Sequence, residues 1–351
     1  MTDITSARSS VEMRREGEQP SGTLHTDWIV ILLSLWFLGG LFLDGWAHNN
    51  LASSLESFFT PWHAVFYTGF LAVAAYHGWL MWQNHRQGYA WRTALPMGYE
   101  LSLLGLVIFS AGGVGDMIWH GIFGIEVGVE ALFSPTHLLL ATGIALVVAG
   151  PMRSTGHRLQ RETADWRSLF PLILSMTFLL SLFTFMAQFA YLLTNPWVLT
   201  GRRPSFDEEI WQVVGVLAAL VHTGLLMGIV LPVLRRWRLP VGTLTFMFTV
   251  NVALMGVMGD ELMGVPTAVL SGLLGDILLL RLRPAAQRPN QFRLFAFLLP
   301  FILYTLYVVS VEITADSWWS IHMLAGLPLL AGIVGFLLSC LVLPPPSFSY
   351  Q

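Results

Sequence analysis

Two segments of the chain carry the same metal-binding residue types at nearly the same spacing. In each, a histidine follows an aspartate by four residues, and a second histidine follows a proline by two. The residues are Asp44, His48, Pro61 and His63 in the first segment, and Asp116, His120, Pro135 and His137 in the second. A carboxylate with two imidazoles is a common ligand set for copper, iron and zinc. The two motifs therefore predict two metal sites.

The spacing suits this chemistry if helices carry the motifs. An aspartate and a histidine four residues apart lie on one face of a helix. Thr60 and Ser134 directly precede the two prolines, where they suit the N-cap, and proline is tolerated in the first turn. We therefore expect each motif to form where one helix ends and the next begins.

Three glutamates accompany the motifs. Glu56 and Glu130 each precede their proline by five residues, whereas Glu126 has no counterpart in the first motif. Each is expected to hold an imidazole N–H or to serve as a further ligand. The alternative is that the aspartate–histidine pairs only hold helices together. Ionisable side chains inside a membrane are rare and costly, and here they recur as two full sets, which favours a metal-binding or proton-handling role.

The composition defines the environment of these motifs. Of the 351 residues, 55% are hydrophobic and only 11% are charged, which is typical of an integral membrane protein. The net charge is -3 and no basic face is present, so no nucleic-acid partner is expected. Cys340 is the only cysteine, which excludes an intramolecular disulfide and cysteine-bound zinc or iron–sulfur centres. A metal site must therefore use histidines and carboxylates.

Apolar runs long enough to cross a bilayer predict an all-α integral membrane protein with about ten transmembrane helices. The runs cover residues 27–46, 61–83, 95–119, 135–152, 169–194, 210–234, 241–260, 264–281, 292–314 and 319–343. Most arginines flank the ends of these runs that share one side of the membrane, which places both termini in the cytoplasm. The helices then form five hairpins that open outward, and the first two hairpins are expected to be a parallel internal repeat.

This topology predicts five segments. Residues 1–26 are expected to be a disordered cytoplasmic tail, and residues 27–152 the duplicated hairpins with the metal motifs. Residues 153–168 form a cytoplasmic loop, residues 169–343 contain the further transmembrane helices, and residues 344–351 are the C-terminal tail. The expected location is a bacterial-type cytoplasmic (inner) membrane, with the motifs on its extracytoplasmic side.

The motifs resemble those of the C subunit of the copper-dependent particulate methane and ammonia monooxygenases, over about residues 38–145. The matching residues are Asp44, His48, Pro61 and His63 for one element of that family, and Trp119, His120, Glu130, Pro135 and His137 for the other. The resemblance implies copper ligands at Asp44, His48 and His63, and at Asp116, His120 and His137. Asp116 stands where the family tends to have asparagine. The intervals of 15 and 17 residues between the histidines of each motif are longer than expected for the family.

The function expected from these features is a copper-dependent membrane monooxygenase or oxidase subunit that acts on a small lipophilic substrate with O2. Iron or zinc is the alternative metal, and no individual catalytic residue is assigned. One alternative function is a protein that transports or delivers metal ions. Another is a b-haem or quinone redox protein with His63 and His137 as axial ligands. A third is a structural or assembly subunit. The expected partners are the lipid bilayer, partner subunits of a membrane oxidase complex, and a lipophilic substrate or metal ion.

Overall fold

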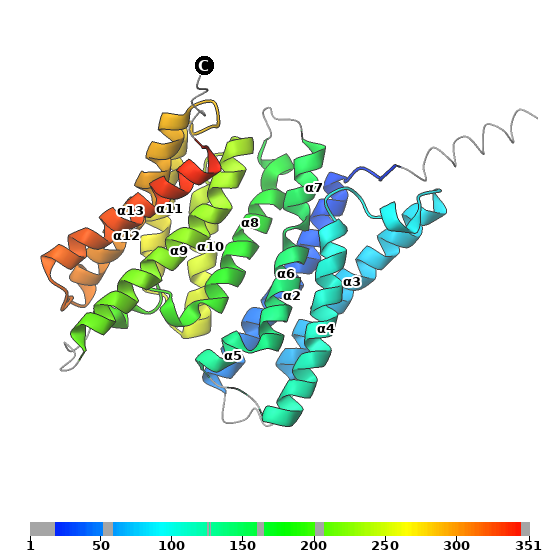
Figure 1. Ribbon diagram of the computed structural model, residues 1–351, viewed down its shortest axis with the longest axis horizontal. Helices are drawn as coiled ribbons and strands as arrows, with labels where there is room; N and C mark the ends of the chain where they lie inside the picture. The colour runs from blue at the N-terminus through cyan, green and yellow to red at the C-terminus, as the bar shows by residue number, and fades with distance from the viewer. Residues whose placement is uncertain are drawn as a thin grey trace, which may run out of the picture. The chain divides into compact units, whose positions relative to one another are not determined.

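The computed structural model describes residues 18–51, 59–124, 126, 128–159, 165–200 and 207–344. The regular elements in this part of the chain are helices, and they divide into two compact units (Figure 1). The first unit contains α2 (Leu24–Asn50), α3 (Pro61–Arg86), α4 (Glu100–Phe123), α5 (Val129–Phe133), α6 (Pro135–Val148), α7 (Gly150–Arg158) and most of α8 (Trp166–Met186). The second contains the end of α8, α9 (Glu208–Arg236), α10 (Thr243–Gly259), α11 (Gly264–Leu282), α12 (Pro289–Thr314) and α13 (Ile321–Val342).

Nine helices among the described residues are long and apolar enough to cross a membrane, where α6 and α7 count as one continuous span, Pro135–Arg158. The remaining expected span, residues 241–260, corresponds to α10, an apolar helix of 17 residues. The structure therefore places a helix at each of the ten predicted runs, and nine of these helices have the length of a membrane span.

Several predicted boundaries differ from the structure. The fifth run was expected to reach residue 194, but α8 ends at Met186 and is followed by the short 3-10 turn Gln188–Ala190. The side chain of Asn195 donates to the Gln188 carbonyl at 2.8 Å. This hydrogen bond satisfies a carbonyl that would accept a backbone N–H if the helix continued. The predicted tail is also shortened, because α2 begins at Leu24. Residues 1–17 and 345–351 of the two predicted tails lie outside the described residues.

The fourth span continues beyond its apolar stretch, so α7 reaches Arg158 inside the predicted loop 153–168. A buried ion pair explains this extension. Arg158 Nη2 lies 3.1 Å from Asp27 Oδ2, and Asp27 is fully buried. The Tyr99 hydroxyl donates to the same carboxylate at 2.7 Å. Burial and the neighbouring Asp27 raise the pKa of Tyr99 well above its ordinary value, so the hydroxyl remains a donor.

Close helix contacts hold the motif-bearing helices of the first unit together. A Cβ on Gly69 of α3 would lie 2.7 Å from the Cα of Phe37 on α2. The corresponding contact between α6 and α4 joins Gly143 and Phe109, where an added Cβ would lie 2.7 Å from the Phe109 Cβ. Only glycine permits such an approach, which is common between membrane helices. Figure 1 shows α5 and the end of α4 at one end of this unit and α7 at the other.

Polar side chains in the second unit join neighbouring helices. Asn251 of α10 donates to Thr184 at 2.7 Å and accepts from the Tyr191 hydroxyl at 2.7 Å. Asp276 of α11 accepts from the backbone N–H groups of Leu244 and Thr245, both at 3.1 Å, at the beginning of α10. Asn251 and Asp276 therefore serve as interhelical hydrogen-bonding groups.

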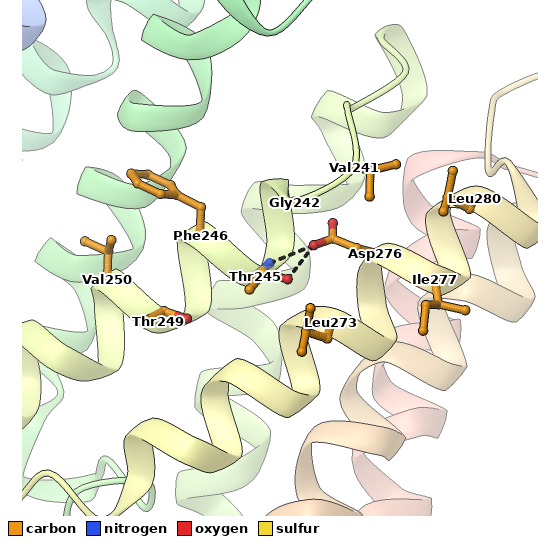
Figure 2. Close-up of a pocket in the computed structure, with 10 residues that line it drawn as sticks. All are labelled: Val241, Gly242, Thr245, Phe246, Thr249, Val250, Leu273, Asp276, Ile277 and Leu280. Carbon is orange, nitrogen blue, oxygen red and sulfur yellow. Dashed lines mark hydrogen bonds between the residues drawn. The ribbon is translucent and has the colours of Figure 1, made fainter.

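Asp276 also lines an apolar groove of about 490 Å³ between α10 and α11 (Figure 2). Its carboxylate is directed toward Thr245, whose hydroxyl donates to it at 2.6 Å. The only charged side chain in the groove therefore caps a helix, and the groove presents no group suited to chemistry.

Candidate metal centres

The first triad forms where α2 ends and α3 begins. Asp44 and His48 lie one turn apart near the end of α2, and His63 lies in the first turn of α3. Thr60 is the N-cap of α3, and its hydroxyl accepts from the His63 N–H at 3.2 Å. The predicted cap therefore fixes the histidine relative to the helix axis. The Nε2 atoms of His48 and His63 lie 3.8 Å and 3.4 Å from Asp44 Oδ2.

The second triad forms in the same way where α4 ends and α6 begins. Ser134 caps α6, with its hydroxyl 3.4 Å from the His137 N–H that it accepts. The Nε2 atoms of His120 and His137 lie 3.5 Å and 3.2 Å from Asp116 Oδ1. Asp116 is almost completely buried, with 1% of its surface exposed. In each triad one ligand atom per residue lies within 4.8 Å of the others.

The separations of the ligand atoms fit a metal ion better than a direct ion pair. Hydrogen bonds between a charged nitrogen and a carboxylate are about 2.7–2.9 Å long, and all four aspartate–imidazole distances exceed this range. Two ligands about 2.1 Å from a tetrahedral ion lie roughly 3.4 Å from each other. Asp44 Oδ1 is buried with no hydrogen-bond partner, which leaves a carboxylate oxygen available to an ion. The donor sets therefore fit a divalent metal.

Neighbouring groups orient the imidazoles of the second triad. His137 Nδ1 lies 2.9 Å from the Ser134 hydroxyl, and His120 Nδ1 lies 3.0 Å from Glu126 Oε2 and 3.2 Å from the Gly124 carbonyl. When Nδ1 of His137 donates to Ser134 and Nδ1 of His120 donates to the Gly124 carbonyl, Nε2 of each ring presents its lone pair to the site. This arrangement is the usual one for a metal-bound histidine.

The three glutamates have different positions. Glu126 contacts His120 and belongs to the second triad's surroundings. Glu130 is exposed on α5, and no contact between its side chain and a triad is recorded among the described residues. Glu56 lies outside the described residues.

Two residues near the triads were not identified from the sequence. Thr136 donates its hydroxyl to Asp116 Oδ1 at 2.8 Å and is 7% exposed. It occupies the variable position between the proline and the histidine, which is Trp62 in the first motif. Tyr67 lies one turn after His63 on α3, with 6.2 Å between the two ring centroids. Its position four residues after His63 on the same helix is a sequence signal that could have identified it.

Two buried histidines outside the motifs each contact a backbone carbonyl one turn earlier on their own helix. His222 is buried on α9, its Nδ1 lies 2.8 Å from the Ala218 carbonyl, and its ring packs against Tyr191. His77 is buried on α3 with the same contact to the carbonyl one turn earlier, that of Val73. In the part of the chain that the structure describes, the only clusters of three or more potential metal ligands are the two triads.

The fold and these clusters define the class of protein: a multi-pass helical chain of the membrane type with two aspartate–histidine triads at helix junctions, each with a buried aspartate. No protein-family model, curated protein or solved structure matches the chain.

Proposed function

We propose that this protein is a membrane metal-binding protein that holds copper at both triads and acts as a monooxygenase or oxidase subunit. The observation that supports the proposal most directly is the convergence of two histidine Nε2 atoms on one buried carboxylate, twice in one unit. Copper is favoured over iron and zinc by the resemblance of the motifs to the monooxygenase C subunit. It also binds nitrogen and oxygen ligands most strongly among these divalent metals. Bound copper would supply the chemistry of O2 activation.

A small lipophilic substrate is supported by the apolar surface beside the triads. The exposed side chains there include Phe59, Ile122 and Phe123, at 81%, 68% and 66% exposure. Phe59 lies just before α3, and the other two lie at the end of α4, one turn or less beyond His120. An apolar molecule dissolved in the bilayer could therefore approach the second triad without crossing a polar surface.

Metal transport is less well supported. An aromatic cluster lies further along α2, α3 and α4 from the triads. Its rings pack with centroids 4.4–5.9 Å apart and belong to Phe37, Phe66, Phe70 and Phe109. These aromatic side chains offer no oxygen or nitrogen ligand for an ion that moves further along the helices. A haem protein is also disfavoured, because His63 and His137 each direct Nε2 at their own aspartate.

The topology of the proposal has five outward-opening hairpins, with the first two related as a parallel repeat. Equivalent contacts support the repeat: Gly69 against Phe37 in one pair of helices and Gly143 against Phe109 in the other. These residues are displaced by 74 and 72 positions, as are the motif residues on the same helices. The triads would face the extracytoplasmic side of a bacterial-type inner membrane, next to partner subunits of an oxidase complex.

The test is the metal content of the purified protein, measured by plasma mass spectrometry. The wild type is compared with the double variants His48→Ala/His63→Ala and His120→Ala/His137→Ala. We expect about two equivalents of copper in the wild type and a loss of one equivalent in each variant. Zinc or iron in the same pattern would retain the sites and refute the copper assignment. Absence of metal from every sample, even after copper loading, would refute the proposal.

A further inference from the structure

The groove between α10 and α11 is lined by one face of each helix. The lining residues of α11 are spaced by three or four positions or are adjacent, and thus share one face. They are Leu273, Asp276, Ile277 and Leu280. The lining residues of α10 share a face in the same way, and are Gly242, Thr245, Phe246, Thr249 and Val250. Figure 2 shows these two rows on neighbouring helices, with Val241 and Leu280 at one end. The groove therefore runs along the two helices.

The walls of the groove are apolar and accessible from outside. Val241, Leu273, Ile277 and Leu280 are 47–52% exposed. The volume of about 490 Å³ falls within the range of about 300–1,000 Å³ that is usual for ligand sites. Exposed apolar side chains that line a groove mark a binding surface for an apolar partner. On helices of the membrane type, the nearest such partner is a lipid acyl chain.

The one charged residue that lines the groove is already neutralised by donors of the protein. The Asp276 side chain is buried, with 3% of its surface exposed. Its two oxygens accept from the backbone N–H groups of Leu244 and Thr245 and from the Thr245 hydroxyl. These donors lie at the beginning of α10, where a helix favours negative charge. Asp276 therefore presents no uncompensated negative charge to a molecule in the groove.

Arginines lie at the end of the groove that Val241 and Leu280 form. Arg281 follows Ile277 by one turn, so it continues the same face of α11, and it is exposed. Arg283 is exposed at the C-cap of α11, and Arg238 is exposed in the loop that leads to Val241. The loops 237–242 and 283–288 contain no aspartate or glutamate. The apolar groove thus ends beside positive charge that these loops do not offset.

We propose that this groove is a binding site for an anionic phospholipid. One acyl chain lies between α10 and α11, and the headgroup phosphate contacts Arg281, while Arg238 and Arg283 add positive charge. A guanidinium matches the geometry of a phosphate, and basic pockets between membrane helices bind such headgroups. All the residues of this site belong to the second unit, so the inference is independent of metal binding at the triads.

The first part of the test measures headgroup preference. The protein is placed in mixed micelles with equal amounts of phosphatidylglycerol and phosphatidylcholine that carry identical acyl chains, and bound lipid is counted by native mass spectrometry. We expect phosphatidylglycerol to be retained preferentially. Arg281→Gln should lower its affinity about fivefold, the effect of one arginine at an anionic membrane surface.

Arg86→Gln is the matched control, because Arg86 is an exposed arginine in the last turn of another helix, α3, and does not line the groove. This variant should bind phosphatidylglycerol as the wild type does. Equal retention of the two lipids by the wild type, or equal losses in Arg281→Gln and Arg86→Gln, would overturn the proposal.

The second part tests the acyl chain. Ile277→Trp fills the groove and should reduce phosphatidylglycerol binding, although every arginine is kept. Leu274→Trp is the control, since Leu274 is also exposed on α11, at 38%, but is not part of the lining. Glycerol phosphate, which has no acyl chain, should not displace the lipid. Wild-type binding by Ile277→Trp, or displacement by glycerol phosphate, would show that the groove does not hold a lipid chain.

Discussion

Replacement of Thr136 by valine should weaken the second metal site and leave the first unchanged. The Thr136 hydroxyl donates to Asp116 Oδ1 at 2.8 Å, and this oxygen is the one that both imidazoles of the triad face. Valine keeps the branched shape but removes the donor. Because Asp116 is 1% exposed, water cannot easily replace the lost hydrogen bond.

The size of the effect follows from the charge on the acceptor. A hydrogen bond to a charged group contributes about 1.5–3 kcal/mol, which corresponds to roughly a 10- to 150-fold change in affinity. Loss of a group that orients a metal ligand typically lowers metal affinity about 10- to 100-fold. We therefore expect the copper affinity of the second site to fall by about tenfold or more in Thr136→Val.

The assay is a chelator competition titration with Cu(II), performed in a background in which the other triad has been removed. Thr142→Val is the matched control, because Thr142 lies on the same helix and its hydroxyl donates only to the Leu138 carbonyl, at 2.8 Å. An affinity within twofold of the parent, or an equal loss at the first site, would show that Thr136 does not act through Asp116.

Three further predictions concern the scaffold, and each is measured by reversible unfolding in mixed micelles. Asp27→Ala leaves Arg158 without its buried partner and should lower the free energy of unfolding by about 3 kcal/mol. The double variant Asp27→Leu/Arg158→Met removes both charges and should regain most of this stability. An Asp27→Ala variant as stable as the wild type would contradict the buried ion pair. Gly143→Val should prevent the close approach of α4 and α6 and reduce the folded yield. Gly121→Ala is the control, because a Cβ at Gly121 would lie in open space, and it should keep the wild-type yield. Similar yields of the two variants would contradict the close contact between Gly143 and Phe109. Asp276→Ala removes the cap of α10 and should cost about 1–2 kcal/mol, and an unchanged stability would show that the cap is dispensable.

The sequence predicted those features that depend on local chemistry. Thr60 and Ser134 were assigned as N-caps because a hydroxyl before a proline suits that position, and both hydroxyls accept the expected histidine N–H. The apolar runs located the helices because helix burial in a membrane requires apolar residues at nearly every position. Helix ends such as Met186 were missed because residues 187–194 are as apolar as a helix would be, and the turn there depends on a side chain several residues away, Asn195.

Contacts between distant segments were not accessible in the same way. The partnership of Arg158 with Asp27 joins residues 131 positions apart, and Arg158 alone is read as a signal of topology. Likewise Tyr67 meets Gly113 only because α3 and α4 lie side by side at that level. Pattern and spacing identify ligands on one helix or at one junction, whereas contacts such as those of Arg158 with Asp27 and of Tyr67 with Gly113 join separate helices.

The two triads are therefore duplicated in their ligands and different in their surroundings. The second has Thr136 on its carboxylate and Glu126 on one imidazole, whereas the first has Trp62 at the position of Thr136 and an Asp44 oxygen without a hydrogen-bond partner. A hydrogen bond to a carboxylate ligand fixes its orientation toward a metal, and a carboxylate on the imidazole increases the basicity of that ligand. Two metal ions bound here would thus differ in their ligand field. Different surroundings on equal ligands are expected when the two sites have separate tasks, and they give each site its own spectrum, by which its occupancy can be followed.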